Sequence, residues 1–296
     1  MTERIEYDEM GMFHENAQEF GLPYEGAPVV QRREVRLDDG RDLSALVWGE
    51  GPAELVLLHG GAQNAHTWDT VALALGRPLV ALDLPGHGHS GPSSTSSLDI
   101  RTNAADVAAA IRALAPDAKA VVGMSLGGIT TLALADQFPE LVRAVVLVDI
   151  TPGVNQAKAK AISDFVNGPE SFASFDDLLA RTIEFNPTRT ESSLRRGILH
   201  NALQQPDGSW VWRYRRFAET SGPPDYAWLW DVVSRLTVPV LLVRGMRPQS
   251  VVDDDDEAEL VRRAPHARVE RIEEAGHSVQ GDTPVELAAL LADVVG

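Results

Sequence analysis

The sequence predicts an α/β three-layer sandwich, built on a mostly parallel eight-stranded sheet with an inserted helical cap. Three observations support this fold class. Short runs that are almost continuously apolar recur along the chain, as in strands buried on both faces of a parallel sheet. Amphipathic or alanine-rich segments lie between these runs, which is typical of strand–helix alternation. One long segment breaks the alternation and concentrates aromatic residues.

The first two predicted strands form a hairpin. The runs 29–37 and 43–48 flank Asp38-Asp39-Gly40, and an Asp-Gly pair supplies the positive φ that a tight hairpin turn needs. The later strands are apolar runs, except for the last, which alternates and is expected at an edge of the sheet. These strands are predicted at 54–60, 78–84, 119–124, 143–149, 238–245 and 267–273.

Helices are predicted between and after these strands, at 99–114, 129–137, 254–263 and 284–295. Residues 151–233 read as several helices inserted between two strands of the sheet, and they include Trp210 and Trp212. An aromatic-rich insertion there is expected to cap the carboxyl ends of the strands, where open α/β sheets bind ligands. The predicted domains are therefore a surface arm at 1–28, a core at 29–150 and 234–296, and a cap at 151–233.

Composition narrows the function classes. The 296 residues include 26 Lys and Arg against 43 Asp and Glu, a formal charge of −17 that disfavours nucleic acid and anionic membrane surfaces as partners. The chain has no cysteine, which excludes disulfides and thiolate chemistry and is compatible with a reducing cytosol. The acidic N-terminus does not read as a signal peptide. We expect a cytoplasmic protein that acts on a small molecule, with homo-oligomerisation left open.

A serine between glycines follows the strand at 119–124. Gly123-Met124-Ser125-Leu126-Gly127 matches the pattern G-x-S-x-G where a strand is expected to turn into a helix. Small flanking residues let the serine occupy a strained turn that projects its oxygen, and the start of the helix adds free N–H groups. The sequence therefore predicts Ser125 as a nucleophile.

Serine alone is a weak nucleophile, so the site needs a base. His277 follows the last strand and precedes the last helix, where a loop can bring its imidazole beside Ser125. Acyl transfer also needs two converging N–H donors that stabilise an oxyanion. Leu126 supplies the first through its backbone, and Gly61, in the loop after 54–60, is assigned as the second, with Ala62 as the alternative.

Four motifs together carry a resemblance to a known family. The segments LLHGGAQNAHTW, DLPGHGHSG, GMSLGG and EEAGHSVQGD, in this order and spacing, resemble the α/β-hydrolase family over roughly residues 29–296. The resemblance implies a Ser–acid–His triad in that chain order, an oxyanion hole and a cap that shapes the pocket. It does not identify the substrate.

The acid of the triad departs from the family's common pattern, because Pro248 stands where an aspartate usually follows the strand after the cap. Some members, such as certain haloalkane dehalogenases, carry the acid after the strand that follows the nucleophile helix, and here that strand ends in Asp149. A carboxylate there is costly to bury unless it is paired, and a histidine would offset that cost. Asp149 is therefore predicted as the acid, with Asp253 in reserve, although the start of a helix suffices to explain Asp253.

The predicted activity is hydrolysis of an ester or related acyl bond in a small, largely apolar substrate, without a cofactor or a metal. Asn64, Trp210 and Trp212 are candidates for contact with the substrate, and capping of the next helix is an equal alternative for Asn64. C–C bond hydrolysis, lactone hydrolysis, cofactor-free perhydrolase or haloperoxidase-like chemistry and non-catalytic ligand binding stay open. Dehalogenase and epoxide hydrolase chemistry is disfavoured, because those relatives use aspartate where this chain has Ser125.

Overall fold

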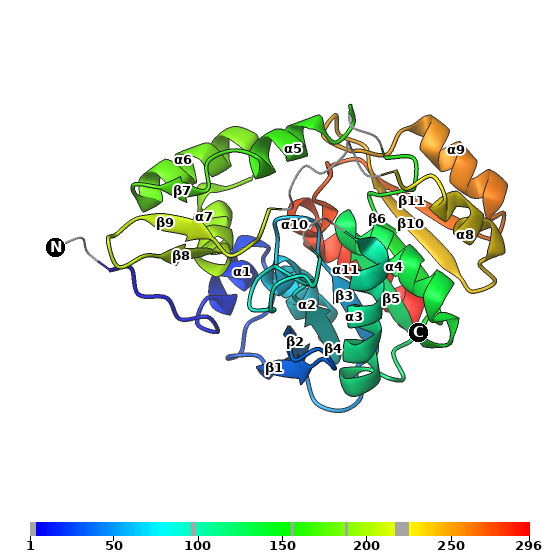
Figure 1. The fold of residues 1–296 in the computed structure, drawn as a ribbon, viewed down its shortest axis with the longest axis horizontal. Helices are drawn as coiled ribbons and strands as arrows, with labels where there is room; N and C mark the ends of the chain where they lie inside the picture. Colours follow the sequence, from blue (N-terminus) through cyan, green and yellow to red (C-terminus); the bar gives the residue numbers. More distant parts are fainter. Residues whose placement is uncertain (1–3, 96–98, 155–156, 187–188, 217–224) are drawn as a thin grey trace.

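The computed structural model describes residues 4–95, 99–154, 157–186, 189–216 and 225–296, organised around one large sheet (Figure 1). The strands of this sheet are β1 (Val30–Arg36), β2 (Asp42–Trp48), β3 (Leu55–Leu58), β4 (Leu79–Leu82), β5 (Ala120–Met124), β6 (Val145–Val148), β10 (Val240–Gly245) and β11 (Arg268–Ile272). Their order is β1-β2-β4-β3-β5-β6-β10-β11, with β2 antiparallel to both its neighbours and all other pairs parallel. The predicted fold class is confirmed, and β11 lies at the edge.

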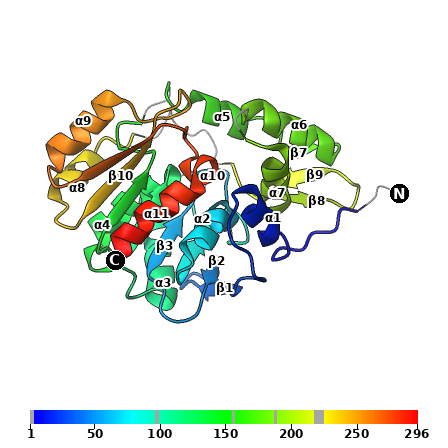
Figure 2. The ribbon, with the colours of Figure 1, turned by 180° about the vertical axis from the view of Figure 1, so that it is seen from behind.

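Helices cover both faces of the sheet (Figures 1 and 2). One face packs against α3 (Ile100–Leu114), α4 (Leu126–Gln137), α8 (Leu229–Arg235) and α9 (Asp254–Arg263). The other packs against α1 (Phe13–Glu19), α2 (Asp69–Leu75), α10 (Val279–Asp282) and α11 (Pro284–Val295). Two short 3₁₀ helices, η1 (Ala65–Trp68) and η2 (Pro139–Leu141), complete the layers. Among the described residues, no helix combines the length and the apolar character needed to cross a bilayer.

The central strands are apolar on both sides because both sides are covered. In β3, Leu55 and Leu57 pack into the apolar cluster of one face, while Val56 and Leu58 pack into that of the other. All four side chains are fully buried. Burial of one such side chain contributes about 1.5–3 kcal/mol relative to exposure, so these strands fix the sheet on which the candidate site is built.

The segment between β6 and β10 contains more than the predicted helices. Its elements are α5 (Lys160–Val166), β7 (Ser171–Phe172), α6 (Phe175–Phe185), α7 (Glu191–Asn201), β8 (Ala202–Gln204), β9 (Trp210–Trp212) and then α8. The three strands form a small antiparallel sheet, β7-β9-β8, around an apolar cluster that includes Trp210. Helix α8 instead packs against α4 in the core, so the insertion's own packing ends before α8.

The N-terminal arm is not confined to the surface, which differs from the expectation. Phe13 of α1 is 1% exposed and meets Trp48 edge to face, with ring centroids 4.9 Å apart. Ile5 and Tyr7 pack against the apolar cluster of the insertion. The arm therefore connects the core with the insertion, and Figure 1 shows it running past β8 and α7. Its apolar residues are too few and too irregularly spaced to show a period in the sequence.

Candidate active site

Ser125 lies at a sharp turn between β5 and α4, at the carboxyl end of a central strand. Its φ of 51° and ψ of −117° are values that residues with a side chain rarely adopt. The neighbouring glycines permit this turn, because a Cβ at Gly123 would collide with the backbone of Gly127, and a Cβ at Gly127 would collide with the backbone of Leu58. Close packing of strand and helix thus holds Ser125 in its strained position.

Asp149 follows β6, the strand next to β5, and is fully buried with a φ of 47°. Both carboxylate oxygens accept two hydrogen bonds each. Oδ1 accepts from the backbone N–H of Gly245, at 2.9 Å, and from Ser250 Oγ, at 2.6 Å. Oδ2 accepts from the backbone N–H of Val251, at 3.0 Å, and from His277 Nδ1, at 2.9 Å. These four bonds satisfy a buried charge and fix its orientation.

His277 lies in the loop between β11 and α10, and its side chain is 11% exposed. Because a carboxylate only accepts, the ring donates Nδ1–H to Asp149 and leaves the lone pair on Nε2. Nε2 is buried and has no hydrogen-bond partner among the residues described. The loop approaches β10 closely, since a Cβ at Gly245 would collide with the carbonyl of Gly276.

The two predicted oxyanion donors lie at the ends of neighbouring strands. Leu126 begins α4, and Gly61 follows β3; in the described part of the chain, neither backbone N–H has an acceptor. The alternative donor, Ala62, instead gives its N–H to His87 Nε2 at 3.2 Å. A Cβ at Gly60 would lie 3.2 Å from Ser125 Cβ, so this loop runs directly beside the serine.

Two histidines of the neighbouring loops form hydrogen bonds with backbone groups. His59 Nε2 accepts from the N–H of Leu84 at 2.9 Å, and burial lowers the pKa of this imidazole. His87 accepts from Ala62, and burial lowers its pKa to about 3. Both rings are therefore neutral acceptors that fix the shape of the loop after β3.

The reserve acid, Asp253, has a local role. It is the N-cap of α9, and it forms a capping box in which its side chain accepts from the N–H of Asp256 at 3.0 Å. Its side chain is 51% exposed and pairs with Lys158 at 2.7 Å. Capping and this ion pair account for its contacts in the structure.

A polar cavity of about 190 Å³ lies between the insertion and the core. Asn64 and Trp212 line it, but Trp210 does not and is buried in the insertion's own apolar cluster. Asn64 also caps η1, accepting from the N–H of His66 at 2.9 Å and donating to the carbonyl of His200 at 3.1 Å. Both roles considered for Asn64 in the sequence are thus compatible with its position.

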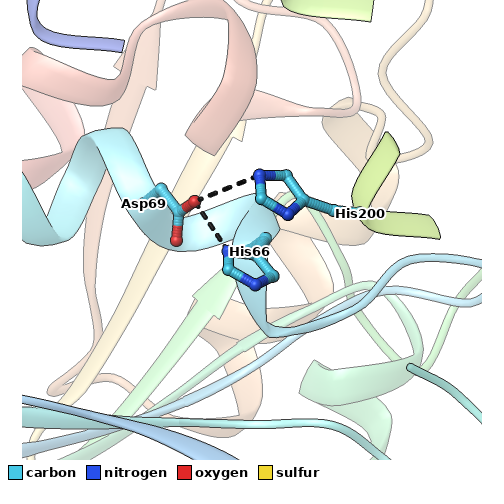
Figure 3. Close-up of side chains that lie close together, drawn as sticks. All are labelled: His66, Asp69 and His200. Carbon is cyan, nitrogen blue, oxygen red and sulfur yellow. Dashed lines mark hydrogen bonds and ion pairs between the residues drawn. The ribbon is translucent and has the colours of Figure 1, made fainter. Parts of the chain in front are cut away.

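A second group of titratable side chains borders this cavity. His66, Asp69 and His200 bring their ligand atoms within 4.8 Å of one another, and Figure 3 shows Asp69 facing both rings. The rings of His66 and His200 stack with centroids 3.7 Å apart and an angle of 12°. Nearly parallel rings hold their in-plane lone pairs in separate parallel planes, whereas a metal needs them to converge. A metal would therefore fit only if one ring turned.

Charge explains the group better than a metal does. Burial alone would lower the pKa of His66, but the Asp69 carboxylate and a hydrogen bond to Glu9 raise it to about 9. Burial and the cationic His66 beside it lower the pKa of His200 well below its usual value. The pair is thus an imidazolium stacked on a neutral imidazole, which accepts from Tyr7 Oη at 2.9 Å.

The sequence did not predict the donors that hydrogen-bond to Asp149, nor the arginine that lines the cavity. Ser250 and Val251 replace the expected acid after β10 with donors to the acid after β6. Pro248, in place of the usual acid, is the one sequence signal that this loop has another arrangement. Arg189 lies just before α7 and lines the cavity, and no local pattern marks it in the sequence.

Comparisons with known proteins place the chain among α/β hydrolases. The profile described as the Alpha/beta hydrolase family matches residues 55–290. Esterase Rv0045c of Mycobacterium tuberculosis is 42% identical over 97% of this chain and 96% of its own length. A solved structure of that esterase aligns with a TM-score of 0.85, covering 98% of this chain and 99% of that one. The sn-1-specific diacylglycerol lipase ABHD11 of Xenopus laevis is 27% identical over 77% of this chain and 75% of its own length.

Proposed function

The chain belongs to the α/β hydrolase family, and from that premise we propose that it is a carboxylesterase-like serine hydrolase with Ser125, His277 and Asp149 as its triad. The observation that carries the proposal is the 2.9 Å hydrogen bond from His277 Nδ1 to Asp149 Oδ2. Asp149 follows β6, and β6 lies beside β5, the strand that leads to Ser125. An ester is favoured as the scissile bond because the relative from M. tuberculosis, 42% identical, is named an esterase.

Acylation begins when Ser125 Oγ attacks the ester carbonyl and His277 Nε2 takes the hydroxyl proton. The carbonyl oxygen becomes an oxyanion, which the N–H groups of Leu126 and Gly61 stabilise. Collapse of the tetrahedral intermediate breaks the bond to the alcohol oxygen, and His277 returns the proton to the departing alcohol. Asp149 keeps the imidazole in the tautomer that leaves Nε2 free and stabilises the transient imidazolium.

Deacylation repeats these steps with water. His277 Nε2 removes a proton from water as its oxygen attacks the acyl carbon, and the same two N–H groups hold the second oxyanion. The intermediate then expels Ser125 Oγ, which takes the proton back from His277. The released acid and the regenerated serine balance the reaction without a cofactor.

Residues 151–233 act in this proposal as a cap that shapes the pocket for a small, largely apolar substrate. Trp212 stacks on Tyr214 with ring centroids 5.4 Å apart and meets Phe165 at 5.7 Å, so the insertion turns aromatic surface toward the cavity. Trp212→Ala should change chain-length preference, whereas Trp210→Ala should lower the stability of the insertion.

Replacing the serine tests the proposal directly. Ser125→Ala should reduce turnover of 4-nitrophenyl butyrate by about 10⁶-fold, as loss of the nucleophile does in serine hydrolases, while circular dichroism stays unchanged. A fluorophosphonate should label wild-type protein at Ser125 and leave the variant unlabelled. Near-native turnover by the alanine variant would exclude this triad. A panel of esters, lactones and vinylogous diketones separates ester hydrolysis from the alternative activities.

A further inference from the structure

Arg189 is a mostly buried cation at the border of the cavity. It stands just before α7, whose N-cap is Thr190, and its guanidinium donates to Ser193 Oγ. The guanidinium also lies against α10, because a Cβ at Gly281 would collide with it. Helix α10 begins directly after the loop of His277, so Arg189 joins the insertion to the segment that carries the proposed base.

No carboxylate in the described chain lies within ion-pair distance of this guanidinium. The two acids that act on it from farther away are Asp282 and Glu19. Asp282 accepts from the N–H of Gly276 at 2.9 Å, and Glu19 pairs with Arg196 and accepts from Thr190. Burial lowers the pKa of Arg189 despite those two acids. A buried cation without a counterion is costly, which favours a site where a ligand supplies the charge.

The cavity connects Arg189 with residues that adjoin the proposed reaction. Gln63 and Gln280 line it together with Arg189. Gln63 belongs to the oxyanion loop, and its Oε1 accepts from the N–H of Gly60 at 3.1 Å. Gln280 lies one turn after His277 and donates to Thr67 Oγ1 at 3.2 Å. Ser125 and His277 do not themselves line the cavity, but these two amides place it beside the oxyanion loop and the helix that follows His277.

We propose that the cavity is an acid-recognition subsite, in which Arg189 pairs with a free carboxylate of the ester substrate. The substrate class is then a half-ester of a short dicarboxylic acid, or an ester whose alcohol part carries a carboxylate; this rests on the proposed esterase function. A guanidinium matches a planar carboxylate with two parallel N–H bonds, and one unpaired cation balances one negative charge. Phe165 and Trp212 supply apolar surface for the methylene groups between ester and carboxylate.

Matched charged and neutral esters test this assignment. The probes are 4-nitrophenyl half-esters of the linear dicarboxylic acids from malonic to suberic, compared with 4-nitrophenyl esters of monoacids of equal length. A second arm uses acetyl esters of ω-hydroxy acids and of the corresponding alcohols. Arg189→Gln should lower kcat/KM for the best charged ester, relative to its neutral match, by about 10- to 100-fold, mainly through KM. Arg189→Lys should retain part of this preference, because it keeps the charge.

Arg195→Gln is the matched control, because Arg195 is exposed on α7, the helix that directly follows Arg189. It should leave the ratio of charged to neutral turnover unchanged. The assignment is overturned if Arg189→Gln lowers both ester types equally, or if wild-type protein shows no preference in either arm. Should Arg189→Gln fail to fold, competitive inhibition of neutral-ester turnover by adipate in wild-type protein decides, and no competition overturns the proposal. Loss of the esterase function itself would be evident separately, as absent turnover of the neutral esters.

Discussion

In two buried aspartate–histidine pairs of this protein, the hydrogen bond between imidazole and carboxylate has nearly the same length. His277 Nδ1 lies 2.9 Å from Asp149 Oδ2 in the proposed triad, and His66 Nδ1 lies 2.8 Å from Asp69 Oδ2 beside the cavity. Both aspartates are at most 1% exposed. The distance between the two groups therefore does not tell which pair can serve a reaction, and the difference must come from what surrounds them.

The carboxylates differ first. Asp149 accepts four hydrogen bonds, three of them from Gly245, Ser250 and Val251, so its charge is stabilised whatever His277 does. Asp69 Oδ1 is buried without a partner among the described residues, and burial raises the pKa of this carboxyl, opposed by the charge of His66. Asp69 depends on a cationic neighbour, whereas Asp149 can hold a neutral one.

The two pairs differ more at Nε2, the imidazole nitrogen that does not bond to the aspartate. His277 Nε2 has no partner in the described chain, so its lone pair is free, as the proposed role of a base requires. His66 Nε2 lies 3.1 Å from Glu9 Oε1, and the ring face is covered by His200. A general base needs a nitrogen that can take up a proton at the reaction centre. A free Nε2, rather than the aspartate–histidine bond, is therefore the feature that separates the proposed base, His277, from the ion-paired His66.

The contrast is tested most strongly by removing the charge of each aspartate. Asp149→Asn should lower kcat by about 10⁴-fold, because the amide can favour the wrong tautomer of His277 and no longer stabilises the imidazolium. Asp69→Asn should leave kcat per folded molecule within about threefold, since its histidine does not face the serine. Both values come from steady-state turnover of 4-nitrophenyl butyrate below the unfolding temperature. Equal losses in the two variants would remove the distinction between the pairs.

Stability should respond to the second pair. Asp69→Asn leaves the His66 cation buried with one acidic neighbour fewer, and breaking a buried ion pair costs about 3–5 kcal/mol. Urea unfolding should therefore show a free energy of unfolding lower by about 3 kcal/mol. Asp117→Asn is the control, because Asp117 is 82% exposed and should change the value by less than about 0.5 kcal/mol. An Asp69→Asn variant as stable as wild type would mean that His66 is neutral.

The pH dependence of stability tests whether His66 is charged. The pKa of His66 is raised from 6.5 to about 9, so protonated His66 stabilises the fold fully below pH 6.5 and loses this effect as the pH rises through 9. The difference in unfolding free energy between wild type and His66→Gln should therefore shrink by about 3 kcal/mol between about pH 6 and about pH 9.5. A difference that stays constant over this range would contradict a charged His66.

What the sequence could predict follows from how locally each feature is encoded. The buried strands have continuous apolar runs, and the turn at Ser125 has its own glycine pattern, so both could be predicted from neighbouring residues. Strands β7, β8 and β9 have two or three residues each, too few to show a period. The group of His66, Asp69 and His200 joins η1 and α2 to the insertion, and only the folded chain brings these residues together.

The surroundings of Asp149 could be predicted from the sequence only in part. Its place at the end of an apolar strand predicted a buried, paired carboxylate, and the hydrogen bond to His277 agrees with that prediction. The donors at the end of β10 and in the loop after it could not be predicted in the same way, because two of their three bonds to Asp149 come from backbone N–H groups. Any residue except proline can supply a backbone N–H, so the sequence gives little indication of these two bonds.

The smallest expected effect concerns the other candidate acid. Asp253 caps α9 and pairs with Lys158 while its side chain stays 51% exposed. Asparagine is also a good N-cap, and exposed ion pairs contribute little, so Asp253→Asn should cost less than about 1 kcal/mol of stability. Turnover should stay within about twofold of wild type, because His277 Nδ1 is already bonded to Asp149. If instead Asp253→Asn lost about 10⁴-fold in kcat while Asp149→Asn remained active, the proposed acid would be wrong, although Ser125 and His277 could keep their roles.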